Sequence, residues 1–290
     1  MTFISYAQNF EDVMLWRALK HVEQGFYVDI GAQNPVTDSV SLAFYENGWR
    51  GVHIEPSPRY ASMLREQRPD EVVIQAAIGT KHSDGLTFYE IPETGLSTAD
   101  EATAHRHQDS GFTVRNIVVP CLTLDEALAP FAGREIHWLK IDVEGYERQV
   151  IEGWEAESIK PWIVMIESTL PLSQTMSNED WEPMVLAKGY QFAYFDGLNR
   201  FFVSSNHLDL MEAFKCGPNV FDGFALSGES SAPFCALLND KIRQAEVRVR
   251  QAEKQLEDQL AAIYASSSWQ LTRPLRAIDT LLQRFKRKPH

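Results

Sequence analysis

The sequence predicts an α/β fold in which a doubly wound, mostly parallel sheet precedes a C-terminal helical extension. Up to about residue 225, short runs of β-branched and aromatic residues alternate with helical patterns. Those runs are apolar on both faces, as in a parallel sheet that helices cover on either side. Beyond residue 237, apolar residues recur at near-heptad spacing between charged ones, which predicts a long helix.

The predicted strands and helices follow one another in a regular order. Strands are expected at residues 25–30, 50–55, 71–78, 135–143 and 161–168, and helices at 38–48, 57–67, 146–154 and 178–190. Repeated strand–helix units of this kind imply right-handed crossovers. The polar stretch from residue 80 to 128 is expected to add further strands and a flexible loop over one end of the sheet.

These patterns divide the chain into four parts. Residues 1–225 form the main domain, and residues 226–237, rich in small side chains, are expected to be a linker. Residues 238–265 form the heptad-patterned helix, which either joins two copies of the chain as a homodimer or packs on its own domain. Residues 266–290 form a basic amphipathic tail, which either contacts an anionic membrane surface or an acidic partner, or is a solubilising end.

Composition excludes several functional classes. The net charge of −13 disfavours nonspecific binding to nucleic acid. Three cysteines without metal-like spacing fit a reducing cytoplasm and argue against a disulfide framework or a zinc site. No apolar run is long enough to span a bilayer, and the N-terminus lacks the pattern of a secretory signal. A cytoplasmic protein is therefore expected, at the inner face of the membrane if the basic tail binds there.

The informative polar residues follow the predicted strands, because ligands of doubly wound sheets bind beyond the carboxyl ends of the strands. Asp29 ends the first strand and Gly31 opens its turn, where the missing Cβ lets the backbone approach a ligand. Glu55 ends the second strand, and an acid there can accept hydrogen bonds from ribose hydroxyls. Asp142 and Glu144 end a later strand, where they could position a cationic ligand, bind a metal or accept a proton.

Each of these residues also has a purely structural interpretation. The turn after Asp29 has one glycine, whereas a dinucleotide-binding fingerprint has three. Glu55, Asp142 and Glu144 could simply cap the helices that follow them. The presence of all of them at predicted carboxyl ends favours a binding site.

Nine segments together resemble the FkbM family of methyltransferases, in the order in which that family has them. They cover residues 3–225 and read SYAQNFEDVML, GFYVDIGAQNP, NGWRGVHIEPSP, QAAIG, TGLST, LTLDEAL, LKIDVEGYE, VMIES and FDGLNRFFV with PNVFDGF. The resemblance implies a Rossmann-like class I fold, with a seven-stranded sheet whose last strand is antiparallel. It also implies that S-adenosylmethionine is the cofactor and that the methyl group goes to a hydroxyl oxygen of a sugar, surface glycan or related natural product.

The resemblance also implies roles for individual residues. Around the cofactor, it places Asp29, Gly31, Ala32 and Gln33 at the methionine end, Glu55 at the ribose, Gln75, Ala76, Ala77 and Ile78 at the adenine, and Asp142 near the sulfonium. Gln8, Glu11 and Asp12 match a polar N-terminal motif that closes over the cofactor, and Ser97 and Thr98 match a loop that faces the substrate. Gln33 stands where many relatives have asparagine.

The catalytic chemistry stays open at this point. A sugar hydroxyl needs a base or a metal to lower its pKa, and the candidate bases are Asp142, Glu144, His105 and His107. A divalent metal such as magnesium is an open alternative, with Asp142, Glu144 and Glu167 as its candidate ligands. Two other functions compete with methyl transfer: a nicotinamide-dependent oxidoreductase, and a non-catalytic Rossmann-like scaffold whose C-terminal helix binds partners.

Overall fold

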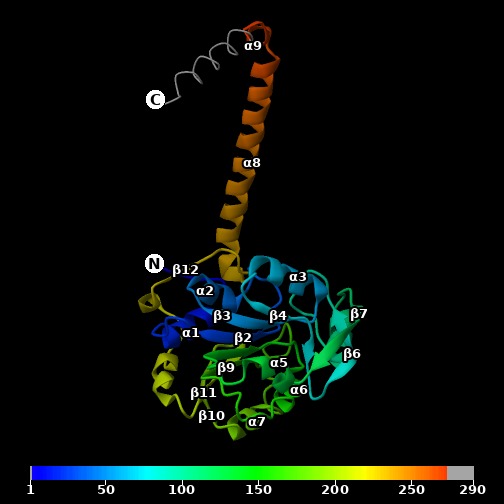
Figure 1. The fold of residues 1–290 in the computed structure, drawn as a ribbon, viewed down its shortest axis with the longest axis vertical. Helices are drawn as coiled ribbons and strands as arrows, with labels where there is room; N and C mark the ends of the chain where they lie inside the picture. The colour runs from blue at the N-terminus through cyan, green and yellow to red at the C-terminus, as the bar shows by residue number, and fades with distance from the viewer. Residues whose placement is uncertain (1, 273–290) are drawn as a thin grey trace, which may run out of the picture. The chain divides into compact units, whose positions relative to one another are not determined.

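The computed structural model describes residues 2–272, which fall into two units (Figure 1). The first ends at Cys235 and the second begins at Ala236. The predicted tail lies outside the described residues from position 273 onward. No helix in the described part combines the length and the apolar character needed to cross a bilayer.

A seven-stranded sheet forms the centre of the first unit. Its strands stand in the order β10-β11-β9-β8-β2-β3-β4. All neighbouring pairs are parallel except those of β11, which runs antiparallel to both β9 and β10. In the order of the sheet, the strands are β10 (Tyr190–Phe195), β11 (Asn199–Ser204), β9 (Ile163–Glu167), β8 (Trp138–Ile141), β2 (Phe26–Ile30), β3 (Arg50–Ile54) and β4 (Val72–Ile74). The doubly wound sheet with an antiparallel last strand is thereby confirmed.

Helices cover both faces of this sheet. Successive side chains of β9 point to opposite faces, and both sets are buried. Ile163 and Met165 pack into one hydrophobic cluster, whereas Val164 and Ile166 pack into the other. The first face is covered by α1 (Glu11–Leu19) and α2 (Val40–Glu46), and the second by α5 (Leu124–Leu128), α6 (Glu147–Glu152) and α7 (Glu182–Ala187). Each fully buried aliphatic or aromatic side chain contributes about 1.5–3 kcal/mol to folding.

Side-chain caps begin several of the helices. Ser39 accepts a hydrogen bond from the Leu42 N–H at the start of α2, and Asp100 does the same for Thr103 at the start of α4 (Glu101–Asp109). Thr123 and Glu126 form a capping box at α5. Pro58 opens α3 (Pro58–Gln67), where its missing N–H costs no helical hydrogen bond.

Residues 71–78 differ from the predicted single strand. The run divides into β4 and β5 (Ala77–Ile78), because Gln75 and Ala76 leave the central sheet between them. β5 belongs to a separate three-stranded sheet, with β7 (Arg115–Leu122) between it and β6 (Ser83–Glu90). The extra strands expected within residues 80–128 are therefore β6 and β7.

Residues 226–235 pack on the first unit, although the sequence predicts a linker there. β12 (Phe224–Leu226) pairs with β1 (Phe3–Ser5) in parallel. Asp38 then accepts hydrogen bonds from the Ser230 hydroxyl and the Ser231 N–H, at 2.9 and 2.8 Å. The small side chains of this segment serve close packing, and Cys235 is fully buried.

The second unit consists of α8 (Ala236–Ala265) and α9 (Ser267–Leu271). None of the side chains of α8 is buried. Apolar residues remain exposed along it, among them Val249, Leu256, Leu260 and Ile263. A long helix with this pattern resembles one helix of a coiled coil.

Candidate functional site

A cavity of about 520 Å³ opens at the carboxyl ends of β2, β3 and β8. Its volume falls in the range of small-molecule sites. Many of the residues that the sequence singles out line it: Gln8, Glu11, Asp29, Gly31, Ala32, Gln33, Glu55, Ala76, Ala77, Ile78, Ser97, Asp142 and Glu144. Apolar side chains that the sequence analysis did not single out, Tyr60, Met63, Phe88 and Tyr146, also line it. Tyr60 and Met63 come from α3, the helix that follows Glu55, and that position is the signal that could have indicated them.

The turn after β2 is held closely against its neighbours. The Gly31 N–H donates to the Ile54 carbonyl at 2.9 Å, and Gly31 has φ +76°, a conformation that glycine adopts without strain. A Cβ on Gly31 would lie only 1.7 Å from the carbonyl oxygen of Asp142. Gln33 also has a positive φ, +48°, and its side-chain amide donates to the Thr94 carbonyl at 3.3 Å. The turn is therefore held by β3, by the backbone of Asp142 and by the loop that carries Thr94.

Glu55 is positioned by two backbone N–H groups. Its Oε2 accepts from Gln33 at 2.8 Å, and its Oε1 accepts from Ser57 at 2.8 Å. Burial raises the pKa of Glu55 to about 7, although these two hydrogen bonds oppose the rise. Each oxygen keeps a free lone pair, so the carboxylate can still accept hydrogen bonds from a diol in the cavity.

Lys140 links the acids at the ends of β2 and β8. Its Nζ lies 2.9 Å from Asp142 Oδ2 and 3.7 Å from Asp29 Oδ1. Burial alone would lower the pKa of Lys140, but the two carboxylates outweigh burial and raise that pKa. Asp29 Oδ1 is buried and accepts no hydrogen bond within residues 2–272. This oxygen is free to accept one from a ligand.

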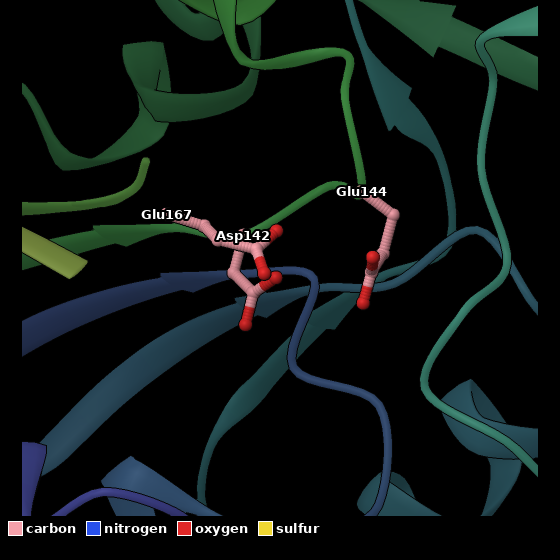
Figure 2. A group of neighbouring side chains, drawn as sticks. All are labelled: Asp142, Glu144 and Glu167. Atoms are coloured by element: carbon pink, nitrogen blue, oxygen red, sulfur yellow. The ribbon is translucent and has the colours of Figure 1, made fainter. Parts of the chain in front are cut away.

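Three carboxyl groups converge beside this lysine, as Figure 2 shows for Asp142, Glu144 and Glu167. One oxygen from each lies within 4.8 Å of the others. Burial, followed by repulsion from neighbouring carboxylates, raises the pKa values of Glu144 and Glu167 well above their usual range. An acid whose pKa is raised toward neutrality can act as a general base.

Glu144 stands on a strained turn. Its φ is +56°, in the left-handed region that side chains other than glycine seldom adopt. The Thr98 hydroxyl donates to the Glu144 carbonyl at 2.8 Å and accepts from the Asp100 N–H at 2.9 Å. The loop predicted to face the substrate therefore also holds this turn in place.

A second cavity, of about 470 Å³, adjoins the first. The two share Gln8, Leu96, Glu144 and Ser231 among their lining residues. Glu167, Thr169 and Asp196 line the second cavity only, as do the exposed apolar side chains of Leu172 and Phe234. Sequence analysis does not find these residues as a group, because they come from segments far apart in the chain.

The polar N-terminal motif divides between two roles. Gln8 and Glu11 line the first cavity, and burial, with repulsion from Asp196, raises the pKa of Glu11 to about 8. Asp12 is instead fully buried, and it accepts hydrogen bonds from the Ser5 hydroxyl and the Tyr6 N–H. The carboxylate of Asp12 stabilises the turn before α1.

Besides Asp12, four predicted residues do not line either cavity. Gln75 leaves the sheet where β4 ends, and its side chain accepts a hydrogen bond from Arg65 at 3.3 Å. The fully buried Thr98 contacts the Glu144 backbone, as described above. His105 and His107 lie on α4, the first exposed and the second buried. The two histidines are therefore poorly placed to act as bases.

The chain is similar to known methyltransferases in sequence and in fold. The family model described as the methyltransferase FkbM domain matches residues 29–192. Magnesium protoporphyrin IX methyltransferase from Synechocystis PCC 6803, solved with bound S-adenosylmethionine, is similar at 10% identity and a TM-score of 0.38. The matched region covers 68% of this chain and 79% of the Synechocystis chain. A TehB-like S-adenosylmethionine-dependent methyltransferase from Corynebacterium glutamicum is similar at 7% identity and a TM-score of 0.37, covering 67% of this chain and 88% of its own. No curated protein matches the chain.

The strand order, the antiparallel β11 and the cavity at the carboxyl ends define a class I methyltransferase fold. The family match covers more than half of the chain. The chain therefore belongs to the FkbM family of methyltransferases.

Proposed function

We propose that this protein transfers a methyl group from S-adenosylmethionine to a hydroxyl oxygen of a sugar, surface glycan or related natural product. The observation that carries the proposal is that Asp29, Glu55 and Asp142 come from three different strand ends and line one cavity. Family membership supports the transferred group, and the two adjoining cavities leave room for a cofactor and an acceptor.

The residues of the first cavity fit this cofactor. Glu55 offers a fixed carboxylate for the ribose hydroxyls. Asp29 Oδ1, which accepts no hydrogen bond within residues 2–272, offers an acceptor for an ammonium group. Ala76 and Ala77 leave room for a flat base, and both are buried. When bound, the cofactor supplies an electrophilic methyl group on a positively charged sulfur.

The protein's own part is to orient the acceptor and to receive its proton. Glu144 lines both cavities, so it can contact an acceptor in the second while facing the first. Its raised pKa suits a general base for a hydroxyl, whereas Asp142 forms an ion pair with Lys140. Alignment of the reacting groups supplies the remaining acceleration.

Calorimetric titration tests the proposal. The purified full chain is titrated with S-adenosylmethionine and S-adenosylhomocysteine, with NADH as the control ligand and Asp29→Ala as the control variant. Micromolar binding of the first two ligands, lost in the variant, is expected, and transfer of a labelled methyl group to glycan acceptors is then measured. Binding of NADH alone would favour the oxidoreductase, and binding of none would favour the non-catalytic scaffold.

Partners and location also belong to this proposal. The exposed apolar residues of α8 support a coiled-coil homodimer. The basic residues beyond position 272 support peripheral contact with an anionic membrane from the cytoplasmic side. Together with a glycan acceptor, such contact would fit a role in polysaccharide biosynthesis.

A further inference from the structure

We propose that Asp142, Glu144 and Glu167 bind one divalent, oxygen-coordinated metal ion such as Mg²⁺ or Mn²⁺. The three side chains come from the end of β9 and from the loop after β8, and they lie around one point (Figure 2). One carboxylate oxygen from each lies within 4.8 Å of the other two. Carboxylate oxygens are the ligands that such hard cations prefer.

A second observation points to a ligand at this cluster. Glu167 is only 7% exposed, and its Oε2 has no hydrogen-bond partner among the residues that the structure describes. Glu144 Oε2 is buried and unpartnered in the same way. A buried carboxylate oxygen without a partner is costly, and native proteins nearly always satisfy such an atom. A cation between the two glutamates would satisfy both.

Lys140 attracts both glutamates, but its ion pairs are with other acids. Its Nζ pairs with Asp29 and with Asp142, one member of the cluster. No lysine, arginine or histidine in the described range 2–272 forms an ion pair with Glu144 or Glu167. One lysine, shared with Asp29, therefore faces three carboxyl groups, and a divalent ion would stabilise the ionised form of all three.

The spacing of the three carboxylate oxygens suits a divalent ion between them. Three oxygens no more than 4.8 Å apart can all lie within about 2.8 Å of one point. That distance is a few tenths of an ångström longer than a Ca²⁺–oxygen bond and about 0.7 Å longer than a Mg²⁺–oxygen bond, so side-chain rotation would close the site around either ion. Thr169 adds a neutral oxygen to the second cavity, because its hydroxyl is buried and lacks a partner within the described chain. Water would complete the coordination, as is usual for Mg²⁺.

The position of the cluster assigns the ion a role, and this step rests on the proposed function. Asp142 lines the first cavity, Glu167 the second, and Glu144 both. An acceptor hydroxyl bound to the ion would have a lowered pKa and pass its proton to a neighbouring carboxylate. Its oxygen then bonds to the methyl carbon as the carbon–sulfur bond breaks, and that bond's electron pair stays on sulfur.

Binding of the metal alone tests the inference. The full chain is freed of metal with a chelator and titrated with Mn²⁺, and free Mn²⁺ is followed by electron paramagnetic resonance. One site is expected, with a dissociation constant of roughly 10⁻⁵ to 10⁻³ M. Competition with Mg²⁺ and with Ca²⁺ then tells which size of ion the site prefers.

Matched variants locate the bound ion. Glu167→Gln and Glu144→Gln should each weaken Mn²⁺ binding by about tenfold or more, since each removes one charged ligand. Glu93→Gln, an exposed acid that lines the first cavity outside the cluster, should leave it unchanged. Thermal unfolding shows that each variant is folded.

Two results would overturn the metal site. One is a wild-type protein that binds S-adenosylhomocysteine yet binds no Mn²⁺. The other is Mn²⁺ binding that survives in both glutamine variants, because the ion would then lie elsewhere. Failure of the proposed function is a separate outcome, in which Mn²⁺ binds at the cluster but S-adenosylhomocysteine does not bind at all.

Discussion

The α-carbon of Gly31 faces the backbone carbonyl of Asp142, so closely that a Cβ would lie 1.7 Å from the oxygen. This approach joins the turn after β2 to the loop after β8, two segments separated by more than a hundred residues in the chain. Asp29 precedes the turn, and Glu144 lies in the loop. Their separation across the cavity therefore depends on a contact that only glycine permits.

Gly31→Ala should damage the protein far more than the same change at Gly48. Both glycines have a positive φ, +76° and +88°, so alanine brings backbone strain of about 1–2 kcal/mol at either position. Only at Gly31 does the new methyl group collide with backbone, because nothing lies within 4 Å of a Cβ at Gly48. Urea unfolding and titration with S-adenosylhomocysteine measure the difference, and equal losses in the two variants would refute the packing argument.

Affinity for S-adenosylhomocysteine should fall as the pH drops through about 7. Burial raises the pKa of Glu55 to about 7, so the carboxylate is ionised above that pH and protonated below it. The ionised form accepts hydrogen bonds from hydroxyls more strongly. A dissociation constant about tenfold higher at pH 6 than at pH 8 is expected, because one pH unit below the pKa leaves about a tenth of the group ionised.

Glu55→Gln provides the control for this pH dependence. The variant should bind S-adenosylhomocysteine more weakly by about 1.5–3 kcal/mol at pH 8, the contribution of hydrogen bonds to a charged group. Its affinity should also vary little between pH 6 and pH 8. A wild-type affinity that is already flat over this interval would mean that Glu55 does not contact the ligand.

The sequence predicts the cofactor side of the site because strand ends are visible in it. Asp29, Glu55 and Asp142 each follow an apolar run, and parallel strands bring their carboxyl ends to one edge. Gln75 shows the limit of that argument. It stands inside an apolar run that reads as one strand, and the chain leaves the sheet at that point, so its side chain turns away from the cavity.

Buried polar contacts are the part that sequence reasoning misses. Arg68 lies in the segment REQRPDE, which has the composition of an exposed helix end, yet this arginine is only 1% exposed. The packing of Glu144 against Thr98 is equally invisible, because it joins loops 46 positions apart through a backbone carbonyl. Such contacts depend on tertiary geometry and leave no periodic signal.

Arg68→Met should lower the free energy of unfolding by about 3–5 kcal/mol, the usual cost of removing one member of a buried charge pair. The guanidinium donates to the Pro35 carbonyl at 2.6 Å and to the Ser39 hydroxyl at 3.0 Å, and it lies 3.6 Å from Glu71. The segment that it holds borders the first cavity. Urea denaturation is the measurement. The exposed Arg65, three residues earlier in α3, provides the control variant Arg65→Met, for which a change within about 0.5 kcal/mol is expected.

Thr98→Val should lower the free energy of unfolding by about 1–3 kcal/mol, because it leaves the Glu144 carbonyl and the Asp100 N–H without their buried partner. Valine keeps the shape of threonine, so the loss measures the hydroxyl rather than packing. Thr98→Ser keeps the hydroxyl and should recover most of the stability. Hydrogen exchange at residues 142–147 should rise in the valine variant only. Unchanged exchange there, together with wild-type stability, would mean that the left-handed turn at Glu144 is held by its own neighbours and not by the loop that carries Thr98.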